Sequence, residues 1–437
     1  MLHALKKFIP RSFLQFYHAS LGYVACIVYG NPSHNMIVIG VTGTNGKSST
    51  VQFIAQLLTD LGEKVGYTST AGFSIAGNAV ENRMKMTMPG RFALQAMLRD
   101  MKRAGCTYVI VETSSQGLAQ YRHVGINYDM VVFTNLTPEH IESHGGFEKY
   151  KEAKGMLFSH LTARAHKTIE GKRIPKQILV HSDDAHAAYF ANFPADAHVA
   201  FGWQHYAGKG VYAQEISQDA DGARVEVQDI PVYWHLSARF SRLNALAAVA
   251  TVHSCGFALV DVLVASEKLR DVAGRFERIL VGQPFAVIVD YAYEPYALQA
   301  LFASLPPHTG KVIGVHGSAG GGRDKARRPL IGAIAAEHED VVIVTNEDPY
   351  DEDPQSIIDA VVAGAKEKGK KEGEDLFVIA DRADAIRFAL THAQLGDVVL
   401  ITGKGSEPVM AVAGGKTIPW DDRQVVRNVL SSLGYGA

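Results

Sequence analysis

The stretch Gly40–Thr50 reads GVTGTNGKSST and carries the residue types of a phosphate-binding loop. Gly46, Lys47 and Ser48 match the end of the common triphosphate pattern, but Val41 stands where that pattern requires its first glycine. A helix that begins near Lys47 would point its backbone N–H groups and its positive end at a phosphate. Lys47 could then reach the β- and γ-phosphates of a nucleotide, and Ser48 could ligate Mg²⁺.

The segments around the loop predict the elements that position it. NMIVIGVTG, before the loop, has the apolar run of a buried strand, and KSSTVQFIAQLLTDLG has apolar residues at helical spacing that stop at Gly62. YVIVETSS, DMVVFTNLT and QILVHSD predict further short strands, each followed by polar residues. Such strands alternating with helices indicate a parallel sheet covered on both faces, with its chemistry beyond the carboxyl ends of the strands.

The second half of the chain predicts a second α/β domain. Residues 200–235 alternate apolar and polar side chains, which is typical of antiparallel strands. After GRFERI, five apolar runs recur between helical stretches. We therefore predict an α/β fold with a central P-loop-type parallel-sheet ATPase domain (36–274) and a C-terminal Rossmann-like domain (275–437), preceded by an N-terminal helical segment (1–35).

Composition narrows the class of partner. The chain has 437 residues and a net charge of −2, so bulk electrostatics give no reason to expect nucleic acid binding. Near the N-terminus, Lys6 and Lys7 precede a largely apolar stretch that is too short to span a bilayer. A packed helix is the main interpretation, and a peripheral membrane contact through residues 1–30 is the alternative.

Several further motifs follow the loop: VETSSQGLAQYR, VVFTNLTPEHIESHGGFEKYKEAKGMLF, GRFERI, VDYAYEP, GGGRDKARRPLIG, TNEDPYDEDP and ITGKGSE. Together with TGTNGKSS, their order and spacing resemble the Mur ligase superfamily over about residues 36–410, and most closely its MurE branch, the UDP-N-acetylmuramoyl-tripeptide synthetases. The resemblance implies a cytoplasmic, ATP- and Mg²⁺-dependent ligase that joins an amino acid to a muramoyl-peptide-type carboxylate through an acyl phosphate, in peptidoglycan precursor synthesis. A place at the inner face of the membrane is the alternative location, and the oligomeric state stays open.

The resemblance also implies roles for individual residues. Catalysis is expected of Lys47, Glu112, His140 and Lys154, and metal binding of Ser48, Glu112, His140 and Lys154. Lys154 matches the lysine that the family carbamylates with CO₂, which converts an ammonium into a carboxylate-like anion. The nucleotide is expected to contact Gly43, Thr44, Asn45, Gly46, Lys47, Ser48, Ser49, Asn244, Arg275, Asp290 and Arg323. The substrates are expected to contact Thr87, Ser114, Ser115, Arg122, Asp348 and Glu407.

Three departures from the family pattern concern specificity. About 35 residues precede the loop and do not resemble the N-terminal UDP-binding domain of MurE enzymes, so we expect that domain to be missing, and the donor could carry UDP, a lipid or neither. The DYAHTP motif of the family reads DYAYEP here, so its histidine is replaced by Tyr293 and its threonine by Glu294. Tyr350 replaces the arginine of the diaminopimelate motif, so we expect Asp348 and Glu407 to favour an acceptor with a side-chain amine.

Two other functions compete with this interpretation. A folylpolyglutamate-synthase-like ligase is disfavoured because HIESHGGFEKYKEAK and DEDP follow the MurE pattern. A catalytically silent nucleotide-binding partner protein is disfavoured because Lys47, Glu112, His140 and Lys154 are all retained.

Overall fold

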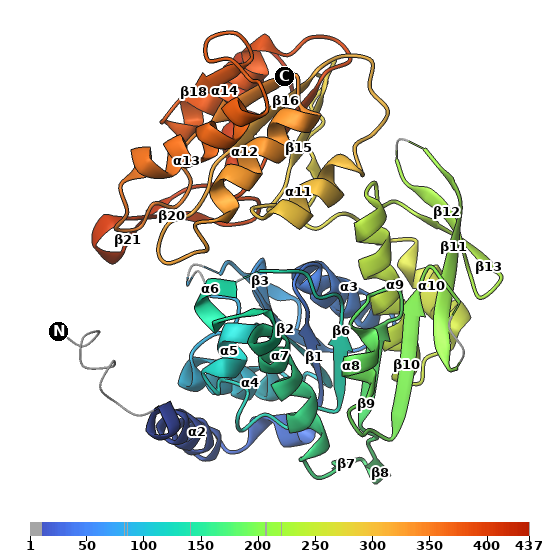
Figure 1. Cartoon of the computed structure of the whole chain (residues 1–437). Helices are drawn as coiled ribbons and strands as arrows, with labels where there is room; N and C mark the ends of the chain where they lie inside the picture. Colours follow the sequence, from blue (N-terminus) through green and yellow to red (C-terminus); the bar gives the residue numbers. More distant parts are fainter. Residues whose placement is uncertain are drawn as a thin grey trace.

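The glycine-rich loop lies between strand β1 (Ile37–Thr42) and helix α3 (Lys47–Asp60), as the sequence pattern predicted. A computed structural model describes residues 11–82, 84, 86–139, 141–205, 208–219 and 221–436 (Figure 1). β1 is buried along nearly its whole length because it pairs with a parallel strand on each side. The loop therefore leaves the carboxyl edge of a central strand, where the chemistry of a parallel sheet is expected.

The large sheet has eleven strands in the order β13-β12-β11-β10-β9-β6-β1-β5-β2-β3-β4. Its seven middle strands, from β11 to β2, are parallel, whereas β12–β13 and β3–β4 extend its two edges with antiparallel pairing. The strands, besides β1, are β2 (Val65–Ser69), β3 (Gly72–Ile75), β4 (Asn78–Val80), β5 (Tyr108–Glu112), β6 (Met130–Phe133), β9 (Gln177–His181), β10 (Ala197–Gly202), β11 (Gly210–Gln218), β12 (Ala223–Val227) and β13 (Ile230–Trp234). The antiparallel region over residues 200–235 is confirmed by β11–β13.

Helices cover both faces of this sheet, so its strands are apolar on both sides. One face packs against α3, α9 (Arg239–Ser254) and α10 (Leu259–Ser266). The other face packs against α4 (Arg91–Arg103), α5 (Ser115–Ala119), α7 (Phe147–Thr162) and α8 (Ala187–Ala191). The short helix α6 (Ile141–His144) precedes α7, and β7 (Thr168–Ile169) and β8 (Lys172–Arg173) form a small hairpin after it.

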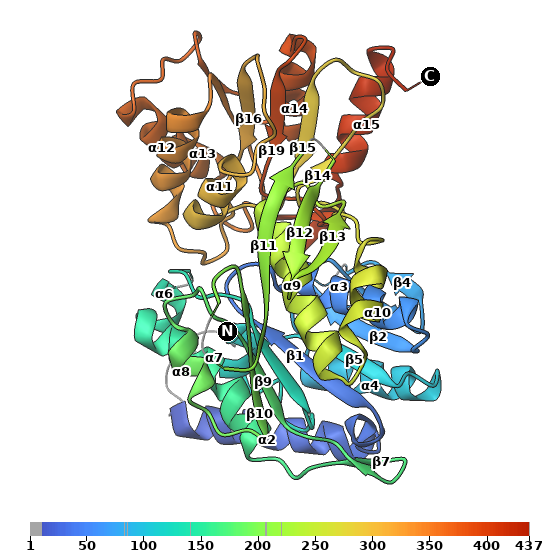
Figure 2. The same cartoon turned by 90° about the vertical axis from the view of Figure 1, so that its right-hand side faces the viewer.

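The C-terminal part forms a separate six-stranded sheet in the order β14-β15-β19-β16-β17-β18, parallel except for β14. Figure 2 shows α11–α13 on one face of this sheet and α14–α15 on the other. The elements are β14 (Glu277–Arg278), β15 (Ala286–Val289), α11 (Pro295–Phe302), β16 (Val312–His316), α12 (Arg327–His338), β17 (Val341–Val344), α13 (Pro354–Glu367), β18 (Leu376–Val378), α14 (Arg382–His392), β19 (Val398–Ile401), β20 (Val409–Val412), η3 (Ala413–Gly415), β21 (Lys416–Pro419) and α15 (Asp422–Ser432).

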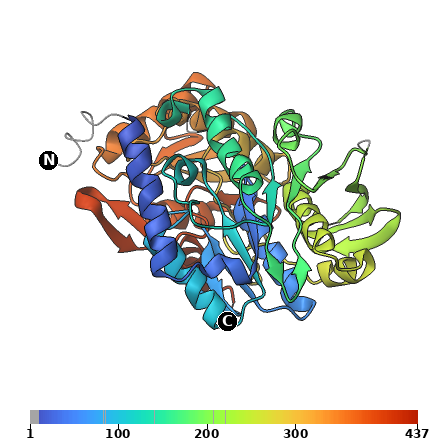
Figure 3. The same ribbon diagram turned by 90° about the horizontal axis from the view of Figure 1, so that it is seen from below.

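The N-terminal helix α2 (Arg11–Val28) is followed by the short 3₁₀ helix η2 (Pro32–Asn35) and packs beside α4 (Figure 3). Of the expected helical segment 1–35, residues 1–10 lie outside the described residues. Among the described helices, none combines the length and the apolar character that crossing a membrane requires.

The predicted fold class is confirmed: a P-loop-type parallel-sheet domain is followed by a second α/β domain with five parallel strands. The exact limits 36–274 and 275–437 stay predictions, although the chain does pass from one sheet to the other between α10 and β14.

Candidate active site

The loop geometry depends on glycine at position 46. Gly46 precedes α3 with a φ of 81°, in the left-handed region that favours glycine. A Cβ atom there would lie 2.2 Å from Asn244 Oδ1, so a side chain would also collide with helix α9. The preceding turn is held by Asn135, which follows the end of β6: its carbonyl accepts from Thr44 N at 2.9 Å and its Oδ1 accepts from Asn45 N at 2.8 Å. The loop is thus fixed before any phosphate binds.

Glu112, the last residue of β5, reaches the start of α3. Its Oε2 accepts hydrogen bonds from Ser48 Oγ at 2.9 Å and from Thr70 N at 2.7 Å, and its Oε1 accepts from Thr70 Oγ1 at 3.0 Å. Lys47 Nζ donates to the Thr44 carbonyl at 2.6 Å, so the lysine folds back over the loop. The structure therefore brings together three residues that the sequence predicted: Lys47, Ser48 and Glu112.

Lys154 on α7 is buried directly beneath the loop. Its Nζ donates to the Gly43 carbonyl at 2.6 Å and lies 4.4 Å from the centre of the Tyr150 ring. Burial, reinforced by the nearby Lys47 charge, holds the pKa of Lys154 well below its ordinary value. The neutral amine that reacts with electrophiles is consequently more populated here than on a surface lysine.

The predicted ligand His140 lies outside the described residues. Its neighbour Glu139 is buried and accepts a hydrogen bond of 2.5 Å from the Tyr293 hydroxyl of the C-terminal domain. In the described ranges, no three histidine, cysteine, aspartate or glutamate side chains gather into a cluster that could hold a metal ion. A hard cation at Ser48 and Glu112 would therefore need further oxygen ligands, which phosphate and water supply.

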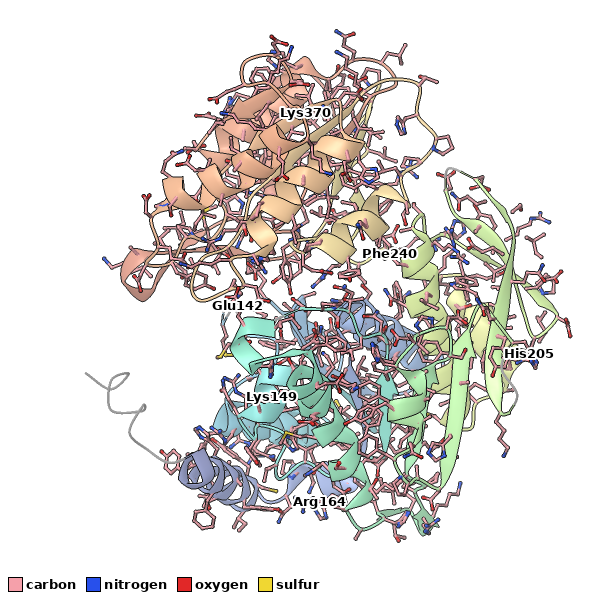
Figure 4. All side chains as sticks on the ribbon, viewed as in Figure 1. Glu142, Lys149, Arg164, His205, Phe240 and Lys370 are labelled. Carbon is pink, nitrogen blue, oxygen red and sulfur yellow. The ribbon has the colours of Figure 1, made fainter. Side chains whose placement is uncertain are left out.

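A cavity of about 340 Å³ lies over the loop and is lined by both domains. The loop supplies Thr44–Ser49, α9 supplies Asn244, and the segment from Arg275 to Ala300 supplies the opposite wall. Arg275 Nη2 lies 3.3 Å from Ser48 Oγ, with its guanidinium 4.1 Å from the centre of the Tyr291 ring. Asp290 is buried and accepts from Phe276 N and Ala292 N at 2.6 Å each, and burial raises its pKa. Phe240, labelled in Figure 4 where the two domains meet, also lines this cavity.

A second, more polar cavity of about 300 Å³ adjoins the first, because Thr70, Thr87, Tyr291 and Tyr293 line both. Its central-domain wall contains the predicted substrate residues Thr87, Ser114, Ser115 and Arg122. Its C-terminal wall contains the predicted Asp348 and Glu407, with Arg323, Arg327, Glu347 and Tyr350. An anionic substrate would meet three arginines there, which suits carboxylate recognition.

The two sequence regions that build these cavities match two family models. Residues 41–252 match the Mur ligase middle domain, and residues 274–405 match the Mur ligase glutamate ligase domain. The chain belongs to the Mur ligase family. It is 38% identical over 424 residues to a UDP-N-acetylmuramyl-tripeptide synthetase of Roseiflexus sp. (strain RS-1), covering 95% of this chain and 83% of that protein.

Other relatives point to the same branch. A UDP-N-acetylmuramoyl-L-alanyl-D-glutamate–2,6-diaminopimelate ligase of Geobacillus kaustophilus is 34% identical, with 95% of this chain and 83% of that protein covered. A solved structure of a ligase with this same name superimposes with a TM-score of 0.59 at 29% identity, covering 91% of this chain and 79% of that one. This Mur ligase is therefore MurE-like and an ATP-dependent ligase.

Two sets of predicted site residues in this Mur ligase have surroundings that the sequence did not show. Arg323 lines the second cavity, where its guanidinium lies 5.8 Å from the centre of the Tyr350 ring, and its contact with the nucleotide stays a prediction. Asp348 and Glu407 were expected to form an acidic pair that favours an acceptor with a side-chain amine. Instead Lys404 Nζ lies between them, 3.0 Å from Asp348 Oδ2 and 2.5 Å from Glu407 Oε2. Lys404 therefore offsets one of the two negative charges, which weakens the attraction of the pair for an amine.

Sequence reasoning missed several groups that the Mur ligase brings to the site. Glu294 Oε1 accepts a 2.8 Å hydrogen bond from Asn45 Nδ2, and burial next to Glu139 raises the pKa of Glu294 to about 7. Glu347 is buried, and its Oε2 has no hydrogen-bond partner among the described residues. For Glu294, the only signal in the sequence was the departure from the family motif at Tyr293–Glu294. For Glu347, no local sequence feature distinguished it from the neighbouring Asp348.

Proposed function

We propose that this Mur ligase joins an amino acid to the carboxylate of a muramoyl peptide, in the synthesis of a peptidoglycan precursor. The observation that carries the proposal is that the cavity over Lys47, Ser48 and Glu112 adjoins an arginine-lined cavity. A γ-phosphate above Lys47 would therefore lie beside a carboxylate held near Ser114, Ser115 and Arg122.

The chemistry has two steps in which the bonds balance. A carboxylate oxygen of the donor bonds to the γ-phosphorus while the bond to the leaving ADP breaks, giving an acyl phosphate. The acceptor nitrogen then bonds to the acyl carbon, phosphate leaves, and the nitrogen loses a proton. Negative charge grows on the transferred phosphoryl group and then on the carbonyl oxygen. The positive charges of Lys47 and Arg275 would stabilise this developing negative charge.

Mg²⁺ fits the oxygen groups at the start of α3. Ser48 Oγ and Glu112 Oε2 are 2.9 Å apart, and both are hard oxygen ligands of the kind that Mg²⁺ prefers. Bound there, the ion would neutralise phosphate charge. Ser48 and Glu112 are the described residues that would hold it, and His140 stays a predicted further ligand.

Carbamylation of Lys154 is part of the proposal. Its buried Nζ and lowered pKa favour the neutral amine, whose lone pair attacks CO₂ as one proton leaves. The product would place a carboxylate beneath the loop, near Glu139. A lysine left unmodified would instead keep a desolvated amine where the site needs anionic oxygen.

The acceptor amino acid would bind at the C-terminal wall of the second cavity. Glu347 is the buried carboxylate there that could accept a hydrogen bond from an acceptor ammonium, because Asp348 and Glu407 already contact Lys404 while Glu347 Oε2 has no hydrogen-bond partner among the described residues. Tyr350 occupies the position of the family arginine with a φ of 52°, and it cannot form the bidentate ion pair that an arginine makes with a distal carboxylate. Arg382 cannot substitute for that arginine, since it is buried and bound to both carboxylate oxygens of Asp422. We infer an acceptor with a side-chain amine and no required distal carboxylate.

The deciding experiment measures phosphate release from ATP with donor and acceptor supplied separately and together. We place the enzyme in the cytoplasm, where ATP is abundant, and the donor panel should contain UDP-linked, lipid-linked and free muramoyl dipeptides. Lysine, diaminopimelate, alanine and glutamate compete as acceptors. Lys47→Ala should abolish turnover, whereas Lys371→Ala, at an exposed position, should leave it unchanged. Turnover that requires no acceptor, or that survives in Lys47→Ala, would refute the proposal.

A further inference from the structure

Helix α2 is apolar on both of its faces. Gly22, Ala25 and Cys26 are buried on the packed side. Phe16, Ile27 and Val28 on the outer side are 72%, 70% and 65% exposed. Tyr17, Tyr23 and Val24 are also exposed, so α2 carries six of the nineteen exposed large hydrophobic side chains among the described residues. A helix that is apolar all round normally lies within a protein core or in a membrane.

The sequence that forms this exposed face lacks the charged side chains expected of a helix face in contact with water. No charged side chain occurs between Arg11 and Lys47, and no aspartate or glutamate occurs before Asp60. A solvated helix face would instead carry charged residues at regular spacing. The charges that the N-terminal sequence does carry, on Lys6, Lys7 and Arg11, are all positive.

Cationic side chains also flank the exposed face within the fold. The Arg164 guanidinium lies 5.4 Å from the centre of the Tyr23 ring, and its Nη2 donates to the Tyr23 hydroxyl at 3.2 Å. Figure 4 shows Arg164 at the end of the molecule where α2 lies. At the other end of the helix, Arg91 is close enough to Tyr17 for the two to interact electrostatically. Tyrosines beside arginines, around an apolar strip, match the headgroup level of a bilayer.

We propose that α2 is an interfacial anchor that lies in the plane of an anionic phospholipid bilayer, with Phe16, Ile27 and Val28 buried at the acyl boundary. None of the described helices could cross the bilayer, so binding would be parallel to its surface. α2 lies at the opposite end of the central domain from the C-terminal domain, so the two cavities stay accessible to substrates on the bound enzyme (Figures 1 and 3).

A second copy of the chain is a poorer occupant of this face. Pairing two α2 helices would bring the positive flanks of both copies together, and this segment supplies no acidic side chain to compensate them. Anionic lipid headgroups carry the opposite charge and would therefore attract these cationic side chains.

The test is sedimentation of the purified protein with vesicles. Wild type should bind vesicles of mixed phosphatidylglycerol and phosphatidylcholine far better than pure phosphatidylcholine vesicles, and less well above about 0.5 M salt. The triple variant Phe16→Gln, Ile27→Gln, Val28→Gln should bind at least tenfold more weakly. The matched triple variant Leu395→Gln, Ile418→Gln, Leu433→Gln, at exposed apolar positions of the C-terminal domain, should bind like wild type.

Arg164→Gln provides a second variant that leaves the apolar strip intact and should reduce the preference for anionic vesicles several-fold. Phosphate release in solution and far-ultraviolet circular dichroism should be unchanged in all three variants. Three results would overturn the proposal. These are absence of binding to anionic vesicles, equal loss in the matched control, and a wild-type dimer that the α2 triple variant converts to the 47.4 kDa monomer.

Discussion

Glu294 Oε1 accepts a hydrogen bond of 2.8 Å from the side-chain amide of Asn45, so a carboxyl group of the C-terminal domain touches the phosphate loop directly. The same side chain caps α11 by accepting from the backbone N–H groups of Tyr296 and Ala297. One residue thus fixes the start of a helix in one domain and the position of the loop in the other. A second contact of this kind joins Tyr293 to Glu139.

The stability of the enzyme should depend on the protonation of Glu294. Its pKa rises from the ordinary 4.5 to about 7 in the folded chain, mainly through burial and secondly through Glu139. The folded state therefore binds more protons than the unfolded chain between these values, and this contribution to stability is lost as pH rises from about 4.5 to about 7. The loss amounts to at most about 3.5 kcal/mol, at about 1.4 kcal/mol for each unit by which the pKa is raised.

Urea unfolding at pH 5 and at pH 8 measures this effect. Glutamine at position 294 in the Glu294→Gln variant cannot ionise, so the variant should not lose this contribution as pH rises. The unfolding free energy of the variant relative to wild type should therefore be higher at pH 8 than at pH 5. Curves that stay parallel from pH 5 to pH 8 would show that Glu294 does not titrate in this range.

Gly46→Ala should impair nucleotide binding specifically. Both Gly46 and Gly62 have left-handed backbones, with φ of 81° and 93°, so alanine costs about 1 kcal/mol of conformational strain at either position. Only at Gly46 would the added Cβ collide, at 2.2 Å from Asn244 Oδ1, whereas nothing lies within 4 Å at Gly62. The KM for ATP should rise at least about tenfold in Gly46→Ala and stay unchanged in Gly62→Ala. An equal KM in both variants would mean that the loop tolerates the clash.

Lys154→Ala should lower turnover by at least about 100-fold, because the buried anion that carbamylation would supply is lost. A short carboxylic acid added to the assay should restore part of the activity by filling the same position, and bicarbonate should not. Lys149→Ala, at an exposed position on the same helix, is the control. Intact mass measured under CO₂ should show one added CO₂ in wild type and none in the variant. An unmodified and fully active wild type would exclude the carbamate.

Glu347→Gln should weaken the acceptor and spare the nucleotide. Burial, with Asp348 beside it, raises the pKa of Glu347, and an acceptor ammonium would offset the buried carboxylate. Losing a hydrogen bond between charged groups costs about 1.5–3 kcal/mol, so the KM for the acceptor should rise by about 10-fold or more, with the KM for ATP unchanged. Glu372→Gln, on the surface, is the control. Equal acceptor KM values for Glu347→Gln and wild type would place the ammonium elsewhere.

The sequence predicted the local part of this site and missed the part that depends on distant pairing. Lys47 and Ser48 follow an apolar run and open an amphipathic helix, so neighbouring residues determine where they lie. Glu294 meets Asn45 across 249 positions of the chain, and no local pattern encodes that distance. The role of Lys404 was missed for the same reason: it lies three residues before Glu407, but its other partner, Asp348, is 56 positions away.

Neither domain contains a complete nucleotide cavity, since the loop lies on one sheet and the wall from Asp290 to Ala300 belongs to the other. ATP can therefore be fully enclosed only by molecules in which the two domains have closed on each other. The apparent affinity for ATP must include the free energy of that closure, so it is weakened by whatever fraction of molecules is open. Substitutions at the contacts between the domains would change nucleotide affinity without touching the nucleotide.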